Sequence, residues 1–345
     1  MSMETVATGL HFPTSLAFDP DGGLWVAESG LPFGDAPPGG RLLRVGRGVV
    51  AEGLGAPTNG ITWHDGAWIV SEGGRPGRIT RITPEGDRTI VLDGLPGHGN
   101  YQTNMAVVRD GWIWFGQGAM TNMGVVGPDS LELGWLGELD HAVDRPGYPI
   151  SVTDASFRAV VKGEERWTGA FAPFGVPGSA RDIPAALPCT SAVMRCRLDG
   201  SGLECVAWGL RNPYGLVFLE DGRLLATDQG ADERGSRPIA RVPELLFEVR
   251  AGAWYGFPDF VGGVPVTDPA FSPEGPPLSF VLTNHAALPP PERPLVSLPP
   301  STAATKMATI PGRPDEILVT LFGEHALAPR RSRPPPNGDR VRRRA

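Results

Sequence analysis

One phrase recurs along the chain: a short apolar strand, a turn that ends in Asp-Gly, and a second strand that closes on small residues. Four clear copies lie at residues 13–30, 59–74, 103–119 and 214–231, and a weaker fifth copy lies at 306–324. Asp-Gly is typical of a tight two-residue hairpin, because both residues tolerate the positive φ that such turns demand. The sequence therefore predicts a chain built from repeated β-hairpins.

A third strand, and often a fourth, follows each hairpin, which makes a four-stranded unit. Gly22, Gly66 and Gly111 stand 44 and 45 residues apart, and a propeller blade takes roughly 40–50 residues. The equivalent Gly222 comes 111 residues after Gly111, so this unit carries an insertion, which we place at about 128–188. We expect an all-β propeller with a long loop region emerging over one face.

Composition supports this reading and excludes several functions. The 47 Gly and 37 Pro disfavour helices, and the net charge of −7 argues against a nucleic-acid surface. No apolar run is long enough to span a membrane, and Met1–Leu10 lacks the pattern of an export signal, which predicts a cytoplasmic chain. The spacing of the cysteines fits no zinc site and leaves either buried thiols or one Cys189–Cys196 bridge.

We expect a single propeller domain over residues 1–325. Residues 326–345 form an Arg/Pro-rich tail that admits a strand only at 338–342, and we expect it to be disordered or the product of truncation or a frameshift. Four complete units and an incomplete fifth leave two possibilities, a five-bladed ring or a chain that stops before a last blade. We favour the second, which would leave strand edges unpaired.

Three polar loops are predicted to converge on one face around the central channel: Gly94–Asn104, Gly209–Gly215 and Thr227–Pro238. Arginine in the second loop offers planar bidentate contact to an anion. The third loop offers a carboxylate and turn carbonyls, the oxygens that calcium prefers. Together they indicate an anionic ligand beside a divalent cation, although each loop taken alone also reads as a solvated turn or an ion pair between blades.

At these loops the sequence resembles the glucose/sorbosone dehydrogenase family, over about residues 13–323. The most specific segments are WGLRNPYGLVF at 208–218, TDQGADERGSRP at 227–238 and AGAWYGFPDFVGG at 251–263. The resemblance implies a six-bladed propeller that uses pyrroloquinoline quinone (PQQ) and calcium to oxidise a sugar or related alcohol, with a separate electron acceptor. It also implies an exported protein, in contrast to the missing signal.

The resemblance assigns roles to residues of two loops. Arg211 and Asn212 match the pair that contacts the quinone. Asp232 matches the calcium carboxylate, and Gly230 and Ala231 match the positions whose backbone oxygens bind the ion. In the implied reaction a base removes the hydroxyl proton while hydride passes to the quinone, and the calcium and Arg211 hold the developing negative charge.

The first loop departs from the family. Asn100 stands where the family carries its catalytic histidine, with His98 two residues earlier and Tyr101 beside it as a cofactor contact. Asparagine cannot act as a general base, so either His98 takes that role or the chain binds cofactor without efficient turnover. The family's lysine has no clear counterpart at 321–323, and Lys306 lies too early to replace it.

Three functions follow from these observations. The first is a PQQ-dependent, calcium-binding sugar or alcohol dehydrogenase. The second is a catalytically reduced propeller that binds a ligand or partner without turnover. The third is a calcium-dependent lactonase-type hydrolase, which would use a ring of oxygen ligands such as Glu28, Asn59 and Asp228 but gives Arg211 no role.

Overall fold

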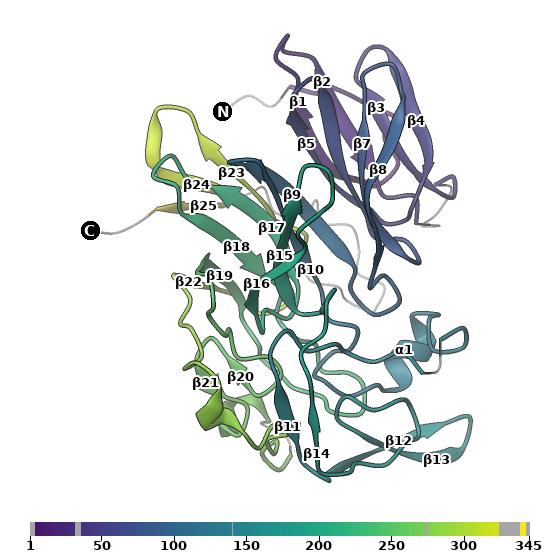
Figure 1. The fold of residues 1–345 in the computed structure, drawn as a ribbon, viewed down its shortest axis with the longest axis vertical. Helices are drawn as coiled ribbons and strands as arrows, with labels where there is room; N and C mark the ends of the chain where they lie inside the picture. Colours follow the sequence, from purple (N-terminus) through teal and green to yellow (C-terminus); the bar gives the residue numbers. More distant parts are fainter. Residues whose placement is uncertain (1–3, 32–35, 140, 273–274, 324–338, 343–345) are drawn as a thin grey trace.

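In the computed structural model, antiparallel sheets follow one another along the chain (Figure 1). The structure describes residues 4–31, 36–139, 141–272, 275–323 and 339–342. The first sheet consists of β1 (Pro13–Phe18), β2 (Leu24–Glu28), β3 (Gly40–Arg44) and β4 (Gly48–Leu54). The second consists of β5 (Thr58–His64), β6 (Ala67–Glu72), β7 (Gly77–Ile82) and β8 (Arg88–Leu95).

The later sheets repeat this pattern. The third consists of β9 (Thr103–Arg109), β10 (Trp112–Gln117), β15 (Ala192–Arg197) and β16 (Glu204–Trp208). The fourth consists of β17 (Pro213–Phe218), β18 (Leu224–Asp228), β19 (Glu244–Val249) and β22 (Val296–Leu298). The last has three strands, β23 (Ala304–Ile310), β24 (Arg313–Leu321) and β25 (Asp339–Arg342), and β25 is the part of the Arg/Pro-rich tail that the structure describes. The predicted all-β propeller is confirmed.

Turns that contain Asp-Gly join the first two strands of the first four sheets as predicted, whereas Pro311–Gly312 joins β23 to β24. In the second and third blades both turn residues have positive φ, with Asp65 at 43° and Gly66 at 73°, and Asp110 at 52° and Gly111 at 75°. In each case the pair forms a two-residue loop between directly paired strand residues. Positive φ at both positions matches the right-handed twist of the flanking strands.

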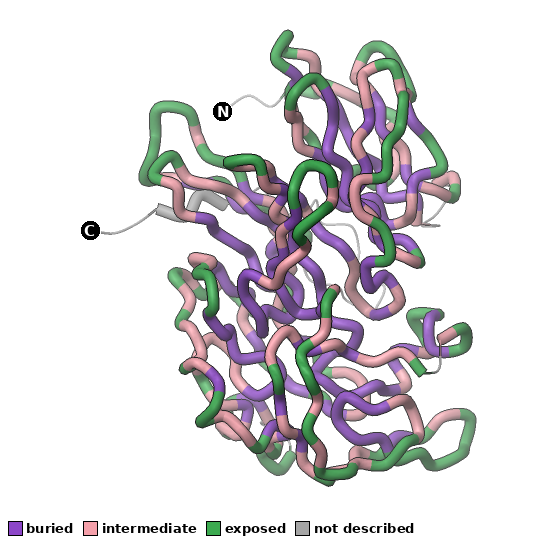
Figure 2. The backbone as a smooth tube through the Cα atoms, in the orientation of Figure 1, coloured by how far each residue is buried: buried purple, intermediate pink, exposed green. Residues whose placement is uncertain are grey.

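The inner strands of successive blades lie side by side, in the order β1, β5, β9, β17 and β23. Apolar side chains pack between neighbouring sheets, and Figure 2 marks many residues of the strands as buried. Between the first two blades the buried side chains include Trp25, Leu42, Ile61, Trp68 and Ile82. Burial of this apolar surface is the main force that holds one blade against the next.

Apolar side chains are exposed on the face of β1 that points away from the second blade. Leu16 occupies the position in β1 that Ile61, Ala106 and Leu216 occupy in β5, β9 and β17. Those three side chains are at most 1% exposed, whereas Leu16 is 66% exposed. Phe18, two residues further along β1, is also exposed. A large apolar side chain in water at a position that is otherwise buried marks a surface made for contact.

The insertion at 128–188 lies between β10 and β15 and contains more regular structure than its sequence predicts. It holds the short helix α1 (Pro128–Glu132) and two antiparallel strand pairs: β11 (Ile150–Val152) with β14 (Arg181–Ile183), and β12 (Ser156–Val161) with β13 (Glu164–Gly169). A second insertion follows β19 and holds β20 (Phe260–Val261), β21 (Val264–Pro265) and the 3₁₀ helices η1 (Pro269–Phe271) and η2 (His285–Ala287).

The two insertions pack against each other at the lower end of the view in Figure 1. A bridge pairs Val152 with Leu282, and both side chains are buried with Trp208 and Trp254 in one cluster. A fully buried ion pair between Arg237 and the Asp259 carboxylate, 2.8 Å apart, ties the segment after β18 to the second insertion. These contacts fix the loops that carry the candidate site.

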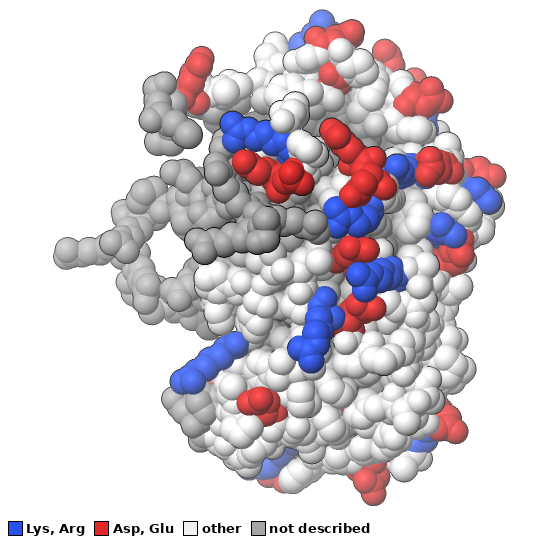
Figure 3. Space-filling view, turned by 90° about the vertical axis from the view of Figure 1, so that its left-hand side faces the viewer, with Lys and Arg blue, Asp and Glu red and all other residues white. Residues whose placement is uncertain are grey.

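Three further observations complete the fold. Cys189, Cys196 and Cys205 are free thiols, so the predicted alternative of a Cys189–Cys196 bridge is wrong. Among the described residues, no helix has the length and apolarity needed to cross a bilayer. On the face shown in Figure 3, acidic and basic side chains are interspersed, as expected for a chain rich in surface ion pairs.

Candidate functional site

Three loops far apart in the sequence meet at one point. Tyr101 precedes β9, Arg211 precedes β17 and Asp232 follows β18. The Arg211 guanidinium donates a hydrogen bond to the Tyr101 hydroxyl, and its carbon lies 4.4 Å from the centre of the Tyr101 ring. Its Nη2 lies 3.6 Å from the Asp232 carboxylate. The structure thus brings together residues from all three predicted loops.

Arg211 is a fully engaged side chain, 5% exposed. Nε donates to the backbone oxygen of Asn122 (2.9 Å), and Nη1 donates to the carbonyls of Gln229 (3.1 Å) and Gly230 (2.5 Å). Nη2 donates to Asn122 Oδ1 (2.6 Å) and to the Tyr101 hydroxyl. These contacts use all five guanidinium donors. Arg211 therefore fastens three segments together and has no free N–H for a ligand.

Arg234, in the loop after β18, is the second cation of the site. Its Nε donates to Asp232 Oδ2 (3.0 Å), Nη1 to Asp129 Oδ2 (2.8 Å) and Nη2 to the Tyr101 hydroxyl (2.9 Å). The side chain is 27% exposed. Three of its donors are engaged, which leaves two N–H groups without a partner among the described residues. Burial opposes the charge, yet Tyr101, Asp232 and Asp129 together hold the pKa of Arg234 above its ordinary value.

The charges around Tyr101 keep fixed protonation states. Burial raises the pKa of the Tyr101 phenol, with Arg211 and Arg234 acting in the other direction, so the hydroxyl stays protonated at neutral pH. Burial alone would raise the pKa of Asp232, but the two guanidinium groups outweigh it and hold that pKa below its ordinary value. The cluster is therefore two cations, an ionised carboxylate and a neutral phenol, with the buried Asp129 beside them.

Asn212, the residue after Arg211, turns its side chain toward the inner strands. It is 2% exposed, its Nδ2 donates to Gln229 Oε1 (2.6 Å), and its Oδ1 accepts from Asn104 Nδ2 (2.7 Å). Its amide thus holds the Gln229 side chain in place. The predicted cofactor contact by Asn212 is untested by this geometry and stays a prediction.

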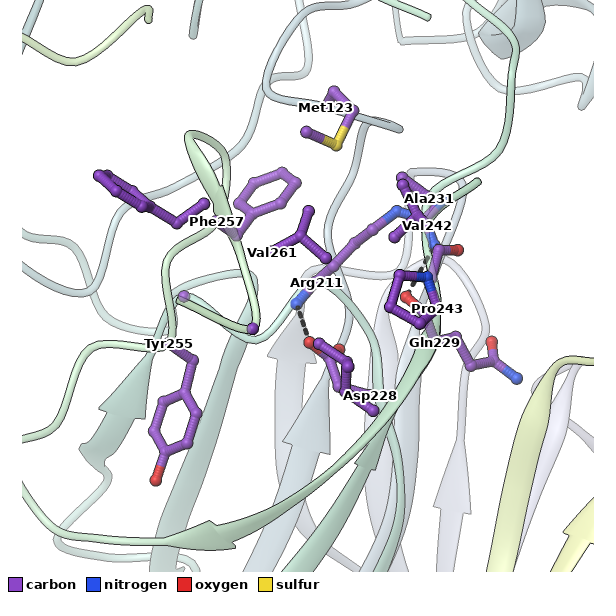
Figure 4. Close-up of a pocket in the computed structure, with 15 residues that line it drawn as sticks. Met123, Arg211, Asp228, Gln229, Ala231, Val242, Pro243, Tyr255, Phe257 and Val261 are labelled. Atoms are coloured by element: carbon purple, nitrogen blue, oxygen red, sulfur yellow. Dashed lines mark hydrogen bonds between the residues drawn. The ribbon is translucent and has the colours of Figure 1, made fainter. Parts of the chain in front are cut away.

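Asp228, the last residue of β18, holds the backbone of the Arg211 loop. Its carboxylate accepts the backbone N–H groups of Arg211 (3.2 Å) and Asn212 (2.7 Å), and burial raises its pKa to about 7. Figure 4 shows it beside Arg211 at a cavity that Val242 and Phe257 also line. The cavity measures about 30 Å³, which is room for about one water molecule. A ligand much larger than water does not fit this cavity.

Asn100 has both ends of its side chain engaged. Its Nδ2 donates to Asp129 Oδ2 (3.0 Å), and its Oδ1 accepts from Trp135 Nε1 (2.9 Å). Asp129 lies in α1 and is 5% exposed, with Oδ1 lacking a hydrogen-bond partner among the described residues. Asn100 therefore connects the first loop to the insertion, and an amide held in this way takes no proton.

His98 is half-buried two residues before Asn100. Its Nδ1 is shielded from solvent and has no hydrogen-bond partner in the described part of the chain. Burial lowers its pKa, and Arg75 and His141 lower it further, while Glu138 acts in the opposite direction. The imidazole is therefore neutral at pH 7 and able to accept a proton. These charged neighbours place it toward the second blade and the insertion rather than against Arg211.

The predicted calcium ligands face guanidinium groups. The Gly230 carbonyl accepts from Arg211, and the Asp232 carboxylate lies between Arg234 and Arg211. Within the described ranges, no three His, Cys, Asp or Glu side chains gather closely enough to hold a metal. As they lie, the Gly230 carbonyl and the Asp232 carboxylate fit guanidinium nitrogens and do not fit calcium, and the predicted contact of the Ala231 carbonyl stays a prediction.

The oxygen ligands suggested for a hydrolase are each taken by a different partner. Glu28 accepts from Arg41 Nε at 2.7 Å, and Asn59 Oδ1 accepts from the Tyr214 hydroxyl at 3.3 Å. Asp228 accepts the backbone N–H groups described above. All three serve the packing of their own loops.

Sequence reasoning missed three residues of the site: Asn122, Asp129 and Arg234. Arg234 lies inside the motif TDQGADERGSRP, so the motif contained its signal, but the pattern does not show where a long side chain reaches. Asn122 and Asp129 lie in and beside the insertion, which carries no readable motif.

Comparisons with known proteins bear on the fold. No protein-family profile matches the chain, and no curated protein matches it. Among solved structures, a putative glucose dehydrogenase from Thermus thermophilus is 20% identical with a TM-score of 0.55, covering 92% of this chain and 78% of its own. The PQQ-bound aldose sugar dehydrogenase of Streptomyces coelicolor is 16% identical with a TM-score of 0.54, covering 99% and 84%.

A third similar structure is the PQQ domain of pyranose dehydrogenase from Coprinopsis cinerea, 15% identical with a TM-score of 0.53 over 92% of this chain and 73% of its own. The chain shares its fold with PQQ-binding sugar dehydrogenases. The resemblance seen in the sequence is thereby confirmed at the level of fold. At these identities the sugar-dehydrogenase fold alone is established, and the activity has to be argued from the residues.

Proposed function

We propose that this protein is a quinoprotein dehydrogenase that oxidises a sugar or related alcohol with PQQ as cofactor. The observation that carries the proposal is the meeting of Tyr101, Arg211 and Arg234, from three loops, at one point of a sugar-dehydrogenase fold. Two of the Arg234 N–H groups have no partner in the part of the chain that the structure describes, and the side chain reaches solvent. A free planar guanidinium is the donor that suits carboxylate and quinone oxygens.

The chemistry of the donor set fits PQQ, a planar quinone that carries carboxylates. Arg234 would hold it through its two free donors, and the Tyr101 hydroxyl would lie beside it. Arg211 and Asn212, the pair carried over from the family resemblance, would hold these groups and Gln229 in place. When bound, PQQ would supply the acceptor for the hydride and its electron pair.

The protein's own residues would supply positioning, charge and a base. Arg234 would hold negative charge that develops on the ligand, in a site that the Asp129 and Asp232 carboxylates keep fixed. The imidazole of His98 would take the proton of the substrate hydroxyl, because its lowered pKa leaves it neutral at pH 7; Nε2 would be the accepting atom, since Nδ1 is shielded from solvent. Calcium takes no part in the proposed reaction, since the Gly230 carbonyl and the Asp232 carboxylate are paired with arginine.

Dye reduction tests the proposal. Purified protein mixed with PQQ, an aldose and an artificial electron acceptor is expected to reduce the dye, and Arg234→Gln is expected to lower kcat/KM by about 10- to 100-fold. Arg158→Gln is the matched control, because Arg158 pairs with Glu165 on an exposed strand of the insertion. Failure of the wild type to reduce the dye with any of a panel of aldoses and alcohols would contradict the proposal.

A second candidate is a propeller that binds its ligand without turnover. The observation that favours it is Asn100, which stands at the family's histidine position and whose amide is held by Asp129 and Trp135. Saturable PQQ binding with no dye reduction under any substrate would select this function.

We also propose that the ring is of the six-bladed type and that a further blade belongs against β1. The support is the exposure of Leu16 at a position where Ile61 and Leu216 are buried by the preceding blade. The same proposal takes residues 1–325 as one domain, with the insertion at 128–188 as part of it.

A further inference from the structure

We propose that this site binds its acidic ligand without calcium, because the guanidinium groups of Arg211 and Arg234 occupy the oxygen atoms that a calcium ion would need. The inference deepens the proposed function and rests on its placing of the ligand beside Arg234. Three contacts support it: Arg211 with Gly230, Arg234 with Asp232, and Arg234 with Asp129.

The first contact stands at a calcium-like distance. Arg211 Nη1 lies 2.5 Å from the Gly230 carbonyl oxygen, and calcium takes its oxygen ligands at about 2.3–2.6 Å. The Gly230 carbonyl oxygen is thus already used by a guanidinium nitrogen. The same group also donates to the neighbouring Gln229 carbonyl at 3.1 Å, so the turn presents its oxygens to Arg211 as a pair.

The second and third contacts neutralise the carboxylates. Arg234 bridges Asp232 (3.0 Å) and Asp129 (2.8 Å), which come from the loop after β18 and from α1. A dication placed among these oxygens would face two guanidinium charges in a partly buried site, where repulsion is screened far less than in water. Calcium also needs six to eight oxygens, and here the carboxylates that would supply them are already paired with arginine.

Arg234 supplies the positive charge that a calcium ion would otherwise supply to the ligand. It places a positive charge beside the Tyr101 hydroxyl and keeps two N–H groups for the ligand. Unlike an ion, a guanidinium favours a planar, bidentate partner. The ligand is accordingly a planar acidic molecule such as a carboxylate-bearing quinone, and its binding is independent of calcium.

Removing Arg234 should make the site more able to bind calcium. In Arg234→Gln the Asp232 and Asp129 carboxylates lose their shared cation, and Asp129 Oδ1 already lacks a partner among the described residues. In the variant only Arg211, 3.6 Å from Asp232, still balances these two carboxylates, so the site carries one positive charge fewer and is closer to the kind of donor set that binds calcium. Arg234→Lys keeps the charge and should keep the wild-type behaviour.

The test is thermal unfolding with and without calcium, in the absence of PQQ. Wild type, Arg234→Lys and the surface control Arg158→Gln should melt at the same temperature in about 10 mM CaCl₂ as in EDTA with NaCl at matched ionic strength. Arg234→Gln should gain about 2 °C or more from calcium. A calcium-dependent rise in wild type, or a folded Arg234→Gln with no rise, overturns the inference.

If Arg234→Gln does not fold, Asp232→Asn decides the question. A calcium response present in wild type and lost in Asp232→Asn overturns the inference, and the same lack of response in both proteins supports it. Because these readouts need no PQQ, failure of the inference is distinguishable from failure of the proposed function, which would show as absent PQQ binding.

Discussion

The guanidinium of Arg211 lies against the ring of Tyr101, 4.4 Å from its centre, although 110 residues separate the two in the sequence. Tyr101 belongs to the loop before β9 and Arg211 to the loop before β17, so the contact joins the third blade to the fourth. With Asn122 and Gly230 as further partners, Arg211 is the point at which the loops of the site are held together.

Arg211→Ala should therefore destabilise the protein as well as the site. The substitution removes one donor from each of five acceptors around a side chain that is 5% exposed, and we expect a loss of about 3–5 kcal/mol in the free energy of unfolding. Urea denaturation measures it, with Arg158→Ala as the exposed control. A loss below about 1 kcal/mol would contradict the fastening role of Arg211.

Asp228 should give the protein a characteristic pH dependence. Its pKa is about 7 in the fold, raised by burial from 3.8, so between pH 4 and 7 the folded state keeps a proton that the unfolded state has lost. Its contribution to stability is therefore lost as pH rises from about 4 to about 7, by about 2–4 kcal/mol.

Asp228→Asn removes this titration. The free energy of unfolding of wild type relative to Asp228→Asn should fall as pH rises from about 4.5 to about 7.5. Parallel denaturation curves at several pH values measure the difference. A difference that stays constant over this range would show that Asp228 titrates normally.

Lys306 is half-buried, and its amino group is enclosed by the protein. Its Nζ is shielded from solvent, has no hydrogen-bond acceptor in the described part of the chain, and lies 4.6 Å from the centre of the Tyr214 ring. Burial lowers its pKa from 10.5 to about 7. Between pH 7 and 10.5 the unfolded state binds the proton that the folded state lacks, so this destabilisation is relieved as pH rises through that range.

Lys306→Met should consequently raise the free energy of unfolding at pH 7 by about 2–4 kcal/mol, with a smaller gain near pH 10. Lys162→Met is the natural control, because Lys162 is the other lysine of the sequence and lies on a surface turn. Equal effects of the two substitutions would refute the assignment.

The exposed face of β1 is tested by a matched leucine pair. Leu216 is 0% exposed and Leu16 is 66% exposed at the equivalent position of another blade. Leu216→Ala should cost about 2–5 kcal/mol, whereas Leu16→Ala should change stability by less than about 0.5 kcal/mol. Thermal unfolding measures both. A large cost at Leu16 would mean that its face is already covered and would argue against a further blade beside β1.

The sequence predicted the hairpins because Asp-Gly carries its own backbone preference. Asp65–Gly66 and Asp110–Gly111 take the positive φ values that the pair tolerates. The hairpin of β12 and β13 escaped prediction for a related reason. Its turn is Lys162–Gly163, with φ of 52° and 81°, and lysine at the first position gives no such signal.

The site was predictable only in part. The loops of Tyr101, Arg211 and Asp232 could be placed together because blade repeats put equivalent loops on one face. The partners of each side chain could not, because a long flexible side chain such as Arg234 finds its acceptors only once α1 and Asp129 are in place. The competition between arginine and calcium for the same oxygens is likewise a property of the folded loops.

Equilibrium titration of PQQ, followed by its absorbance, is the most direct test of the central claim. In EDTA, wild type should bind PQQ saturably at one site per chain, and Arg234→Gln should bind it about 10- to 100-fold more weakly, while Arg158→Gln should match wild type. Absence of binding by wild type, in EDTA and in calcium alike, would contradict the account.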